Sequence, residues 1–414
     1  MTLSRRDLLA ACSRALPLAG GVALASGASS AARPLLRAAG LDPIAAANLQ
    51  EIIRTSPRAR YWTSTAIDPS ACRTCHPTGT LATAKPHVHD PATVKCLLCA
   101  HGCAIKPGQR GRCRARANVA GELRSLVYGR PAAVHVDPIE KKPFYHFLPG
   151  ADAYSFGTAG CPFRCKFCQN WELSQSAPED LEAPFTTAVE TVAAAALRRS
   201  PIIAFTYNEP TVFTEYLLEV AREARKRAIR SVMVSCGFMN AAPLDEMCGA
   251  LDAIKIDLKG FSETFYRTVS NAELQPVLRT IRQIRRRGVH LELVNLVVPT
   301  LNDSDQALRA LANWVAGELG PDVPVHFTRF HPDYQLLNLP PTPIATLDRA
   351  RQFAIDRGLH YVYSGNVPDS PSNHTYCPKC RRIVIERSGF FVTANHLAGG
   401  RCAFCRYPIA GVWT

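Results

Sequence analysis

The chain has 414 residues, 47% of them hydrophobic and 20% charged, and its formal net charge is +14. These values indicate an ordinary folded protein of two or three domains. No apolar run after the N-terminal region approaches the ~20 residues of a membrane span, so no membrane-spanning helix is expected. The Lys and Arg residues are spread along the chain rather than gathered into tracts. A nucleic-acid partner is therefore not expected despite the positive charge.

The first 32 residues have the layout of an export signal. They contain the pair Arg5 and Arg6, a modestly apolar stretch, and small residues suited to cleavage near Ala31. This pattern is typical of a twin-arginine signal, which exports proteins already folded around their cofactors. We therefore expect export to the bacterial periplasm; the alternative is an uncleaved N-terminus and a cytoplasmic protein. Residues 33–70 are expected to form a linker or a peripheral helix.

Cysteine is abundant, and its placement is more informative than its number. Thirteen of the 16 cysteines lie in short-spaced groups, whereas Cys12, Cys236 and Cys248 stand apart. Groups with this spacing form metal sites far more readily than disulfides. The chain is therefore predicted to be a metalloprotein.

Residues 71–150 are predicted to form an N-terminal cysteine-rich domain. The segment CRTCH matches the attachment motif of c-type haem, with a chance CxxC pair as the alternative. That motif consists of Cys72, Cys75 and His76. A following group could close a four-cysteine site for zinc or for an auxiliary iron–sulfur cluster, and spacing alone does not decide between them. The members of this group are Cys96, Cys99, Cys103 and Cys113.

Residues 151–365 alternate between short apolar, β-branched runs and amphipathic helical stretches. Six strand-then-helix units in a row predict a parallel sheet with right-handed crossovers. The expected fold class is α/β, a partial (βα)6 TIM-like barrel short of the eight units of a closed one. The run 359–365 is expected to add an edge strand. The six expected strands are 153–158, 201–207, 231–235, 252–258, 290–298 and 324–330.

Cys161, Cys165 and Cys168 directly follow the first of these strands, in a CxxxCxxC spacing. This position places them in a loop at the C-terminal edge of the sheet, where barrel enzymes have their active sites. Three cysteines can bind three irons of a [4Fe-4S] cluster and leave the fourth iron open to a small molecule. The alternative is a zinc site completed by a distant ligand, although structural zinc prefers paired CxxC halves.

CxxxCxxC with an aromatic residue before the last cysteine, after the first strand of a (βα) series, resembles the radical S-adenosylmethionine (SAM) superfamily. The wider pattern is similar to the radical SAM member of the AmmeMemoRadiSam system, a relative of glycyl-radical-enzyme activases. That similarity rests on the segments GTAGCPFRCKFCQNWELSQ, DPIEKKPFYHFLPG, CLLCAHGCAIKPGQRGRC and AGVW. The resemblance implies that SAM chelates the open iron. One electron from the reduced cluster then cleaves SAM to methionine and a 5′-deoxyadenosyl radical. This radical then abstracts hydrogen from the substrate.

Four residues at expected strand ends are candidates to hold the cofactor. Glu209 lies where the superfamily often has Gly-Gly-Glu and is the candidate for the ammonium group; a helix N-terminal charge is the alternative. Asp257 and Lys259 lie two apart, hence on the same face of a strand. They resemble the Asp-Leu-Lys of glycyl-radical activases, with a surface ion pair as the alternative. His331 occupies the position of a histidine that in the activases reaches the methionine carboxylate.

Residues 366–414 are expected to form a zinc-ribbon or rubredoxin-like domain. Two CxxC pairs are joined by a hairpin-like run and leave no open position, which favours zinc over iron. The ligands are Cys377, Cys380, Cys402 and Cys405.

These features predict a radical SAM oxidoreductase or activase-like enzyme that acts on a small molecule or on a protein of the glycyl-radical type. It requires a low-potential electron donor, and the resemblance implies Memo-like and AMMECR-like companion proteins. One rival hypothesis is an exported electron carrier with several iron–sulfur or haem centres. A second is a radical SAM enzyme that modifies RNA and binds it with a steep salt dependence.

Overall fold

The computed structural model of the protein describes residues 43–64, 91–367 and 369–414, with side chains described from residue 48. The predicted export signal and the CRTCH motif with Cys72, Cys75 and His76 lie outside the described residues. The range expected to be a linker contains helix α3 (Pro43–Thr55) and strand β1 (Trp62–Ser64). Among the described helices, none is both long enough and apolar enough to cross a membrane.

A mixed sheet of eight strands forms the centre of the chain, in the order β13-β12-β11-β10-β9-β8-β7-β6. Strands β7 to β13 are parallel to one another, whereas β6 runs antiparallel to β7. The α/β class is therefore confirmed, and each apolar run expected to be a strand forms one. The strands are β6 (Ala133–Pro138), β7 (Asp152–Gly157), β8 (Ile202–Phe205), β9 (Arg230–Ser235), β10 (Ala253–Asp257), β11 (His290–Val297), β12 (Val325–Arg329) and β13 (Val362–Gly365).

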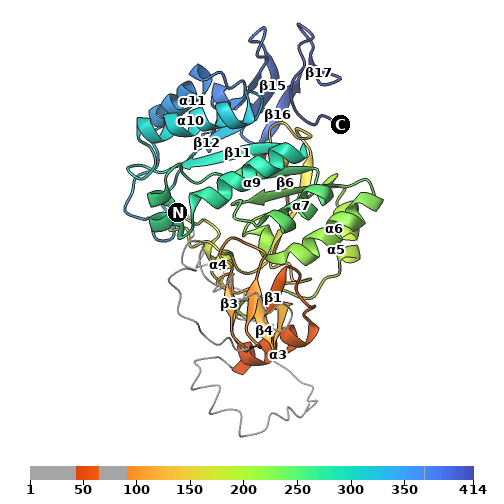
Figure 1. Ribbon diagram of the computed structural model, residues 1–414. Coiled ribbons are helices and arrows are strands. Elements are labelled where there is room, and N and C mark those ends of the chain that lie inside the picture. Colours follow the sequence, from red (N-terminus) through yellow and green to blue (C-terminus); the bar gives the residue numbers. More distant parts are fainter. Residues whose placement is uncertain (1–42, 65–90, 368) are drawn as a thin grey trace, which may run out of the picture. The chain divides into compact units, whose positions relative to one another are not determined.

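Six long helices connect the parallel strands and cover one face of the sheet, with α7 and α9 in front of it in Figure 1. They are α5 (Ala188–Leu197), α6 (Thr214–Lys226), α7 (Ala241–Ala250), α9 (Leu274–Arg287), α10 (Asp305–Leu319) and α11 (Ile344–Asp356). The C-terminus of α9 has three arginines in its last turn and Gly288 in the left-handed conformation (φ 71°). Both features stabilise the free carbonyl end of a helix.

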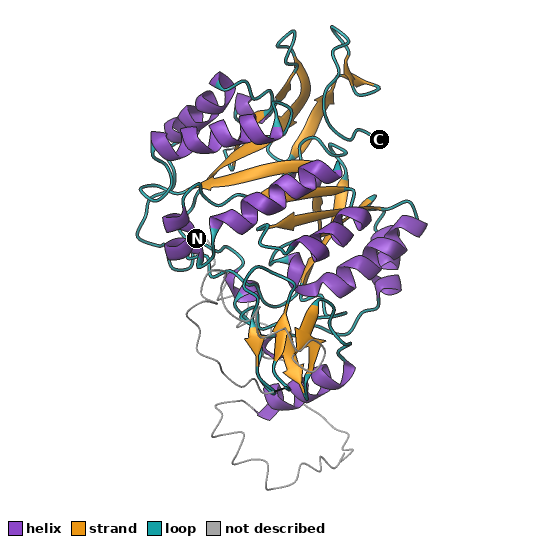
Figure 2. Cartoon of the chain, viewed as in Figure 1, coloured by secondary structure: helices purple, strands orange, loops and turns teal. Residues whose placement is uncertain are grey.

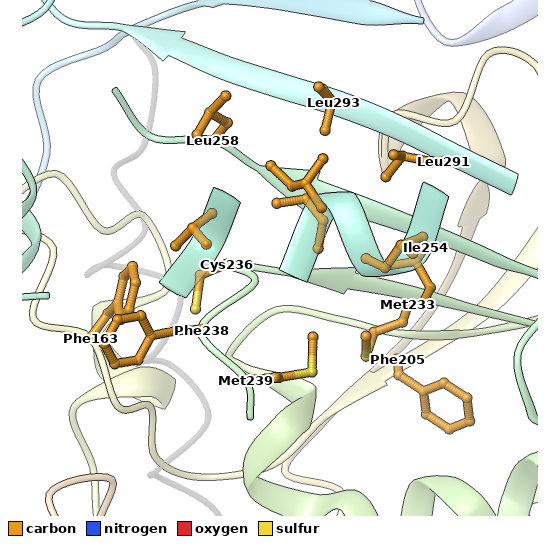
Figure 3. Packing of buried hydrophobic residues seen from close by; sticks show 14 of the residues in the cluster. Phe163, Phe205, Met233, Cys236, Phe238, Met239, Ile254, Leu258, Leu291 and Leu293 are labelled. Carbon is orange, nitrogen blue, oxygen red and sulfur yellow. The ribbon is translucent and has the colours of Figure 1, made fainter. Parts of the chain in front are cut away.

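Alternation along the strands divides the interior into two cores. On β8, Ile203 and Phe205 face the helices, whereas Ile202 and Ala204 face a smaller cluster on the opposite side. The smaller cluster is built by the segment after β6, which includes the short helix η2 (Ile139–Lys141) and Phe147. Figure 3 shows the larger core close up, where the rings of Phe163 and Phe238 pack edge to face with 5.3 Å between their centroids.

Two small antiparallel units flank the central sheet (Figure 2). The N-terminal unit contains a sheet of β1, β2 (Val94–Cys96) and β3 (Ala104–Ile105), and a hairpin of β4 (Arg116–Val119) and β5 (Glu122–Ser125). The C-terminal unit contains β14 (Thr375–Tyr376), β15 (Ile383–Ser388) and β16 (Phe391–Asn395), followed by the hairpin of β17 (Leu397–Ala398) and β18 (Arg401–Cys402). The predicted hairpin-like run between the two CxxC pairs is the β15–β16 hairpin.

Candidate active site at the C-terminal edge of the sheet

A cavity of about 380 Å³ opens where the parallel strands end. Because all seven strands point the same way, the loops after them meet at one edge of the sheet. The cavity wall accordingly takes residues from segments far apart in the sequence: the loop after β7, residues 206–209 after β8, the end of β9, the end of β10, and residues 365–366 after β13. The cavity is thus the meeting point of the chain's parallel strands.

All three cysteines of the CxxxCxxC loop line this cavity. Burial, together with the nearby charges of Glu209 and Cys165, raises the pKa of Cys161 well above its ordinary value. Burial also raises the pKa of Cys165, to about 11, although the ammonium group of Lys259 opposes this shift. The Sγ of Cys168 lies 3.2 Å from the Oγ of Ser174. Three cysteine thiols on one cavity wall are soft donors, so this donor set suits an iron–sulfur group.

The loop is fixed against its surroundings through its backbone. The N–H groups of Arg164 and Lys166 donate to the carbonyls of Ser270 (3.0 Å) and Val269 (3.0 Å). Gly160 has a φ of 88°, and a Cβ atom there would lie 2.2 Å from the carbonyl oxygen of Cys113. Only glycine fits such a position, so the loop is held in direct contact with the N-terminal cysteine-rich unit.

Lys255, Asp257 and Lys259 alternate along β10 and its extension, and all three line the cavity. Asp257 forms ion pairs with Lys255 and, at 2.9 Å, with Lys259. The exposed fractions of the three side chains are 4%, 23% and 17%, so Lys255 is buried and the pair Asp257 and Lys259 is half-buried. Burial raises the pKa of Asp257, but the two ammonium groups outweigh it and hold the value at about 2. Burial lowers the pKa of Lys255, which the carboxylate of Asp257 opposes. With both lysines protonated, the triad carries one net positive charge inside the cavity.

Glu209 is buried and its carboxylate accepts four hydrogen bonds from the chain itself. Its Oε1 accepts from the N–H and hydroxyl of Thr211 (3.1 and 2.5 Å) and from the hydroxyl of Ser235 (2.8 Å). Its Oε2 accepts from the N–H of Cys236 (2.7 Å). Glu209 is also the N-cap of the short helix η4 (Pro210–Phe213). This position agrees with the alternative interpretation of Glu209 as a charge at a helix N-terminus. Glu209 lines the cavity all the same.

Comparison with known proteins identifies the family. Residues 156–312 match the model of the radical SAM superfamily. The chain is 41% identical to an uncharacterized protein of Methanocaldococcus jannaschii over 318 residues. The matched region is 76% of this chain and 95% of that protein. The chain belongs to the radical SAM superfamily. The prediction of a radical SAM enzyme is thereby confirmed.

More distant radical SAM relatives include activating enzymes. The pyruvate formate-lyase-activating enzyme of Clostridium pasteurianum is 22% identical over 164 residues, which are 37% of this chain and 65% of that enzyme. The isethionate sulfite-lyase activating enzyme of Oleidesulfovibrio alaskensis is 25% identical over 111 residues, 26% of this chain and 36% of that enzyme. Among solved structures, a radical SAM methyltransferase from Sphaerobacter thermophilus has a TM-score of 0.44 and 14% identity, and covers 82% of this chain and 93% of its own. The superfamily implies a [4Fe-4S] cluster and SAM as cofactors.

His331 is not among the residues that line the 380 Å³ cavity. Its side chain is exposed, and Nδ1 lies 2.9 Å from the carbonyl oxygen of Pro332. The structure thus brings Glu209, Asp257 and Lys259 to the cavity with the three cysteines, but not His331.

Several cavity residues were not assigned from the sequence. Lys255 shares the period-2 face of Asp257 and Lys259, a signal that was available in the segment KIDLK. Tyr207 has a φ of 71°, the left-handed region that favours glycine, at a position where the superfamily often has one. Asn208 donates from Nδ2 to the carbonyl of Gly160 (2.7 Å) and so supports the three-cysteine loop. Cys236, which stands apart in the sequence, is a fourth thiol in the cavity wall.

The other two predicted cysteine groups each come together in the structure. In the C-terminal unit, the Sγ atoms of Cys377 and Cys405 lie 3.5 Å apart and those of Cys380 and Cys402 lie 3.7 Å apart. All four lie within 4.8 Å of one another, so a metal ion fits between them. The N-terminal group surrounds a second, smaller cavity of about 20 Å³, whose wall contains Cys96, Cys99, Cys103 and Cys113.

Proposed function

We propose that the chain binds a [4Fe-4S] cluster through Cys161, Cys165 and Cys168 and uses it, with SAM in the 380 Å³ cavity, to start a hydrogen abstraction. When bound, this pair of cofactors supplies the one-electron cleavage of SAM to methionine and a 5′-deoxyadenosyl radical. The observation that carries the proposal is the convergence of three thiols and a buried, net positive triad on one cavity. We propose that the central region is an incomplete barrel of six (βα) units with β13 as an edge strand. The C-terminal ends of its parallel strands position the thiols and the triad.

The chain's own residues prepare this cavity for a zwitterionic cofactor. Lys255 and Lys259 offer positive charge to a carboxylate, while the ionised Asp257 offers an acceptor to an ammonium or hydroxyl group. Lys259 additionally favours the thiolate form of Cys165. Four hydrogen bonds from the chain already engage the carboxylate of Glu209. We therefore propose that Glu209 has two roles: it stabilises the loops after β8 and β9, and it contacts the cofactor.

The direct test is anaerobic reconstitution with iron and sulfide, followed by addition of SAM and dithionite. We expect 5′-deoxyadenosine from the native chain and none from the Cys161→Ala, Cys165→Ala or Cys168→Ala variants. Cys248→Ala is the matched control, because Cys248 is also a buried thiol but lies on α7 outside the cavity wall. A native chain with a full cluster that forms no 5′-deoxyadenosine refutes the proposal and favours the electron-carrier hypothesis.

We further propose a protein substrate of the glycyl-radical type, with a small molecule as the alternative. The support is the similarity to relatives named as activating enzymes. A low-potential electron donor is required in either case. The test is radical formation, observed by electron paramagnetic resonance, on a candidate partner lyase mixed with the reconstituted chain and SAM. Salt-sensitive retention of RNA would instead favour the RNA-modifying hypothesis.

The remaining predictions concern the parts around the radical SAM region. We propose that residues 366–414 are an accessory domain, and that residues 71–150 are another up to β6 (Ala133–Pro138), which joins the central sheet. We also propose that the C-terminal four-cysteine group binds zinc, and that Memo-like and AMMECR-like proteins are companions. Twin-arginine export and a c-type haem at Cys72, Cys75 and His76 stay predictions from the sequence. Cell fractionation distinguishes export from a cytoplasmic protein, and a reduced haem absorption band tests the haem.

A further inference from the structure

The four thiols of the N-terminal group surround a small cavity of about 20 Å³ but are not drawn together around one point. In a zinc site, a single ion holds all four thiolate sulfurs at ~2.3 Å. Among the described residues, the group of thiols that is drawn together in this way does not include Cys96, Cys99, Cys103 or Cys113.

The C-terminal group provides an internal comparison. Four thiolates around zinc form a tetrahedron whose edge is about 3.8 Å, given a Zn–S bond of ~2.3 Å. The sulfur pairs of the C-terminal group, at 3.5 and 3.7 Å, match this edge. Within the described ranges, no other group of three or more potential metal ligands is drawn together that tightly. The chain thus contains one compact four-cysteine site and one expanded one.

A buried arginine beside the expanded site lacks part of its hydrogen bonding. Arg116 lines the small cavity and is 1% exposed. One of its terminal nitrogens donates to Glu215 at 2.6 Å, but its Nε has no partner among the described residues. A buried N–H without an acceptor costs free energy, and a thiolate or sulfide of a negatively charged cluster would provide the acceptor.

We propose that Cys96, Cys99, Cys103 and Cys113 bind a second [4Fe-4S] cluster. The residues present suit it in donor type, in the looser arrangement of the four thiols and in the unpaired Nε of Arg116. The spacing of these cysteines left zinc and a cluster equally open, whereas thiols that are less closely grouped than those of the C-terminal site favour the cluster.

The site lies directly behind the three-cysteine loop. Pro162 forms part of the wall of the small cavity, while its two neighbours, Cys161 and Phe163, line the large one. The carbonyl of Pro162 lies 3.1 Å from Nε2 of His101 and accepts from Nε of Arg112 at 3.2 Å. The two sites are therefore on opposite sides of residues 161–163. We infer that a cluster in the second site stabilises the position of the three-cysteine loop.

The test uses the full chain with the triple substitution Cys161→Ala, Cys165→Ala and Cys168→Ala, so that the radical SAM loop binds no iron. After anaerobic reconstitution we expect about four irons and four sulfides per chain, with a [4Fe-4S] Mössbauer spectrum. Adding Cys99→Ser should remove this iron, whereas adding Cys248→Ser should not. Metal analysis should find no more than one zinc per chain, from the C-terminal site.

Two zinc ions per chain and no iron in the triple variant would overturn the proposal, as would iron that survives substitution of both Cys99 and Cys103. Thermal unfolding of each variant separates loss of the cluster from loss of the fold. The outcome is independent of the proposed function, because a native chain that binds eight irons without cleaving SAM would refute that function and leave this site standing.

Discussion

The ion triad of β10 permits a quantitative prediction for Asp257→Asn. The substitution keeps the shape of the side chain but leaves two largely buried ammonium groups without their counter-charge. Breaking a fully buried pair costs about 3–5 kcal/mol, and an exposed pair about 0–1 kcal/mol. The pKa of Asp257, held at about 2 against an ordinary 3.8, corresponds to roughly 2 kcal/mol at ~1.4 kcal/mol per pH unit. We therefore expect the free energy of unfolding at pH 7 to fall by about 2–3 kcal/mol.

The assay is urea unfolding of the native chain and the variant, with Asp245→Asn as the matched control. Asp245 pairs with Arg287 at 3.2 Å, but its side chain is 53% exposed, so its loss should cost less than about 1 kcal/mol. The pH dependence gives a second readout. Because the folded pKa of Asp257 is depressed, its contribution is complete above about pH 4 and is lost as the pH falls towards 2. The native chain and Asp257→Asn should therefore converge in stability over that range.

Two results would refute this reasoning. Equal losses from Asp257→Asn and Asp245→Asn would mean that the triad is effectively solvated. A difference between the native chain and Asp257→Asn that persists unchanged down to pH 2 would mean that the carboxylate charge is not its origin. In the folded variant, equilibrium binding of SAM should also weaken by at least tenfold, since the negative charge that Asp257 offers inside the cavity is lost.

Three further substitutions test separate contacts. Gly160→Ala should prevent full iron loading of the three-cysteine loop, because its Cβ would lie 2.2 Å from the carbonyl oxygen of Cys113; iron content per chain measures this, and full loading would contradict it. Arg387→Met should lower the free energy of unfolding by about 3 kcal/mol, because it leaves the buried Glu140 without its counter-charge, 3.6 Å away; a urea midpoint equal to that of the native chain would contradict it. His331→Ala should change the KM for SAM less than twofold, because the side chain is exposed outside the cavity wall; a tenfold increase would instead support the role in carboxylate binding predicted from the sequence.

Much of the fold was predictable because it depends on local pattern. Continuous apolar runs such as Ile202–Phe205 mark strands buried on both faces, and Gly288 after three arginines marks the end of α9. The antiparallel strand β6 was not predicted, because its residues Ala133–Pro138 fall inside the range assigned to the cysteine-rich domain, whereas they pair with β7 of the central sheet.

The site was predictable only where the chemistry is carried by closely spaced residues. The three-cysteine loop and the pair Asp257 and Lys259 are local motifs, and all of them reach the cavity. Cys236 and Arg116 carry no such signal, since each acquires its surroundings from segments distant in the sequence. His331 shows the converse: its position after β12 fitted the expectation, but the direction of its side chain depends on the turn that follows.

Cys236 bears on why the loop contains three cysteines and not four. Its thiol lies in the same cavity wall as Cys161. Burial and the neighbouring Glu209 raise its pKa well above the ordinary value, which favours the neutral thiol. The thiolate is the form that binds iron. On the proposal that the three-cysteine loop binds a cluster, burial and the carboxylate of Glu209, which four hydrogen bonds hold in place, would both disfavour Cys236 as a fourth ligand and leave that position to SAM.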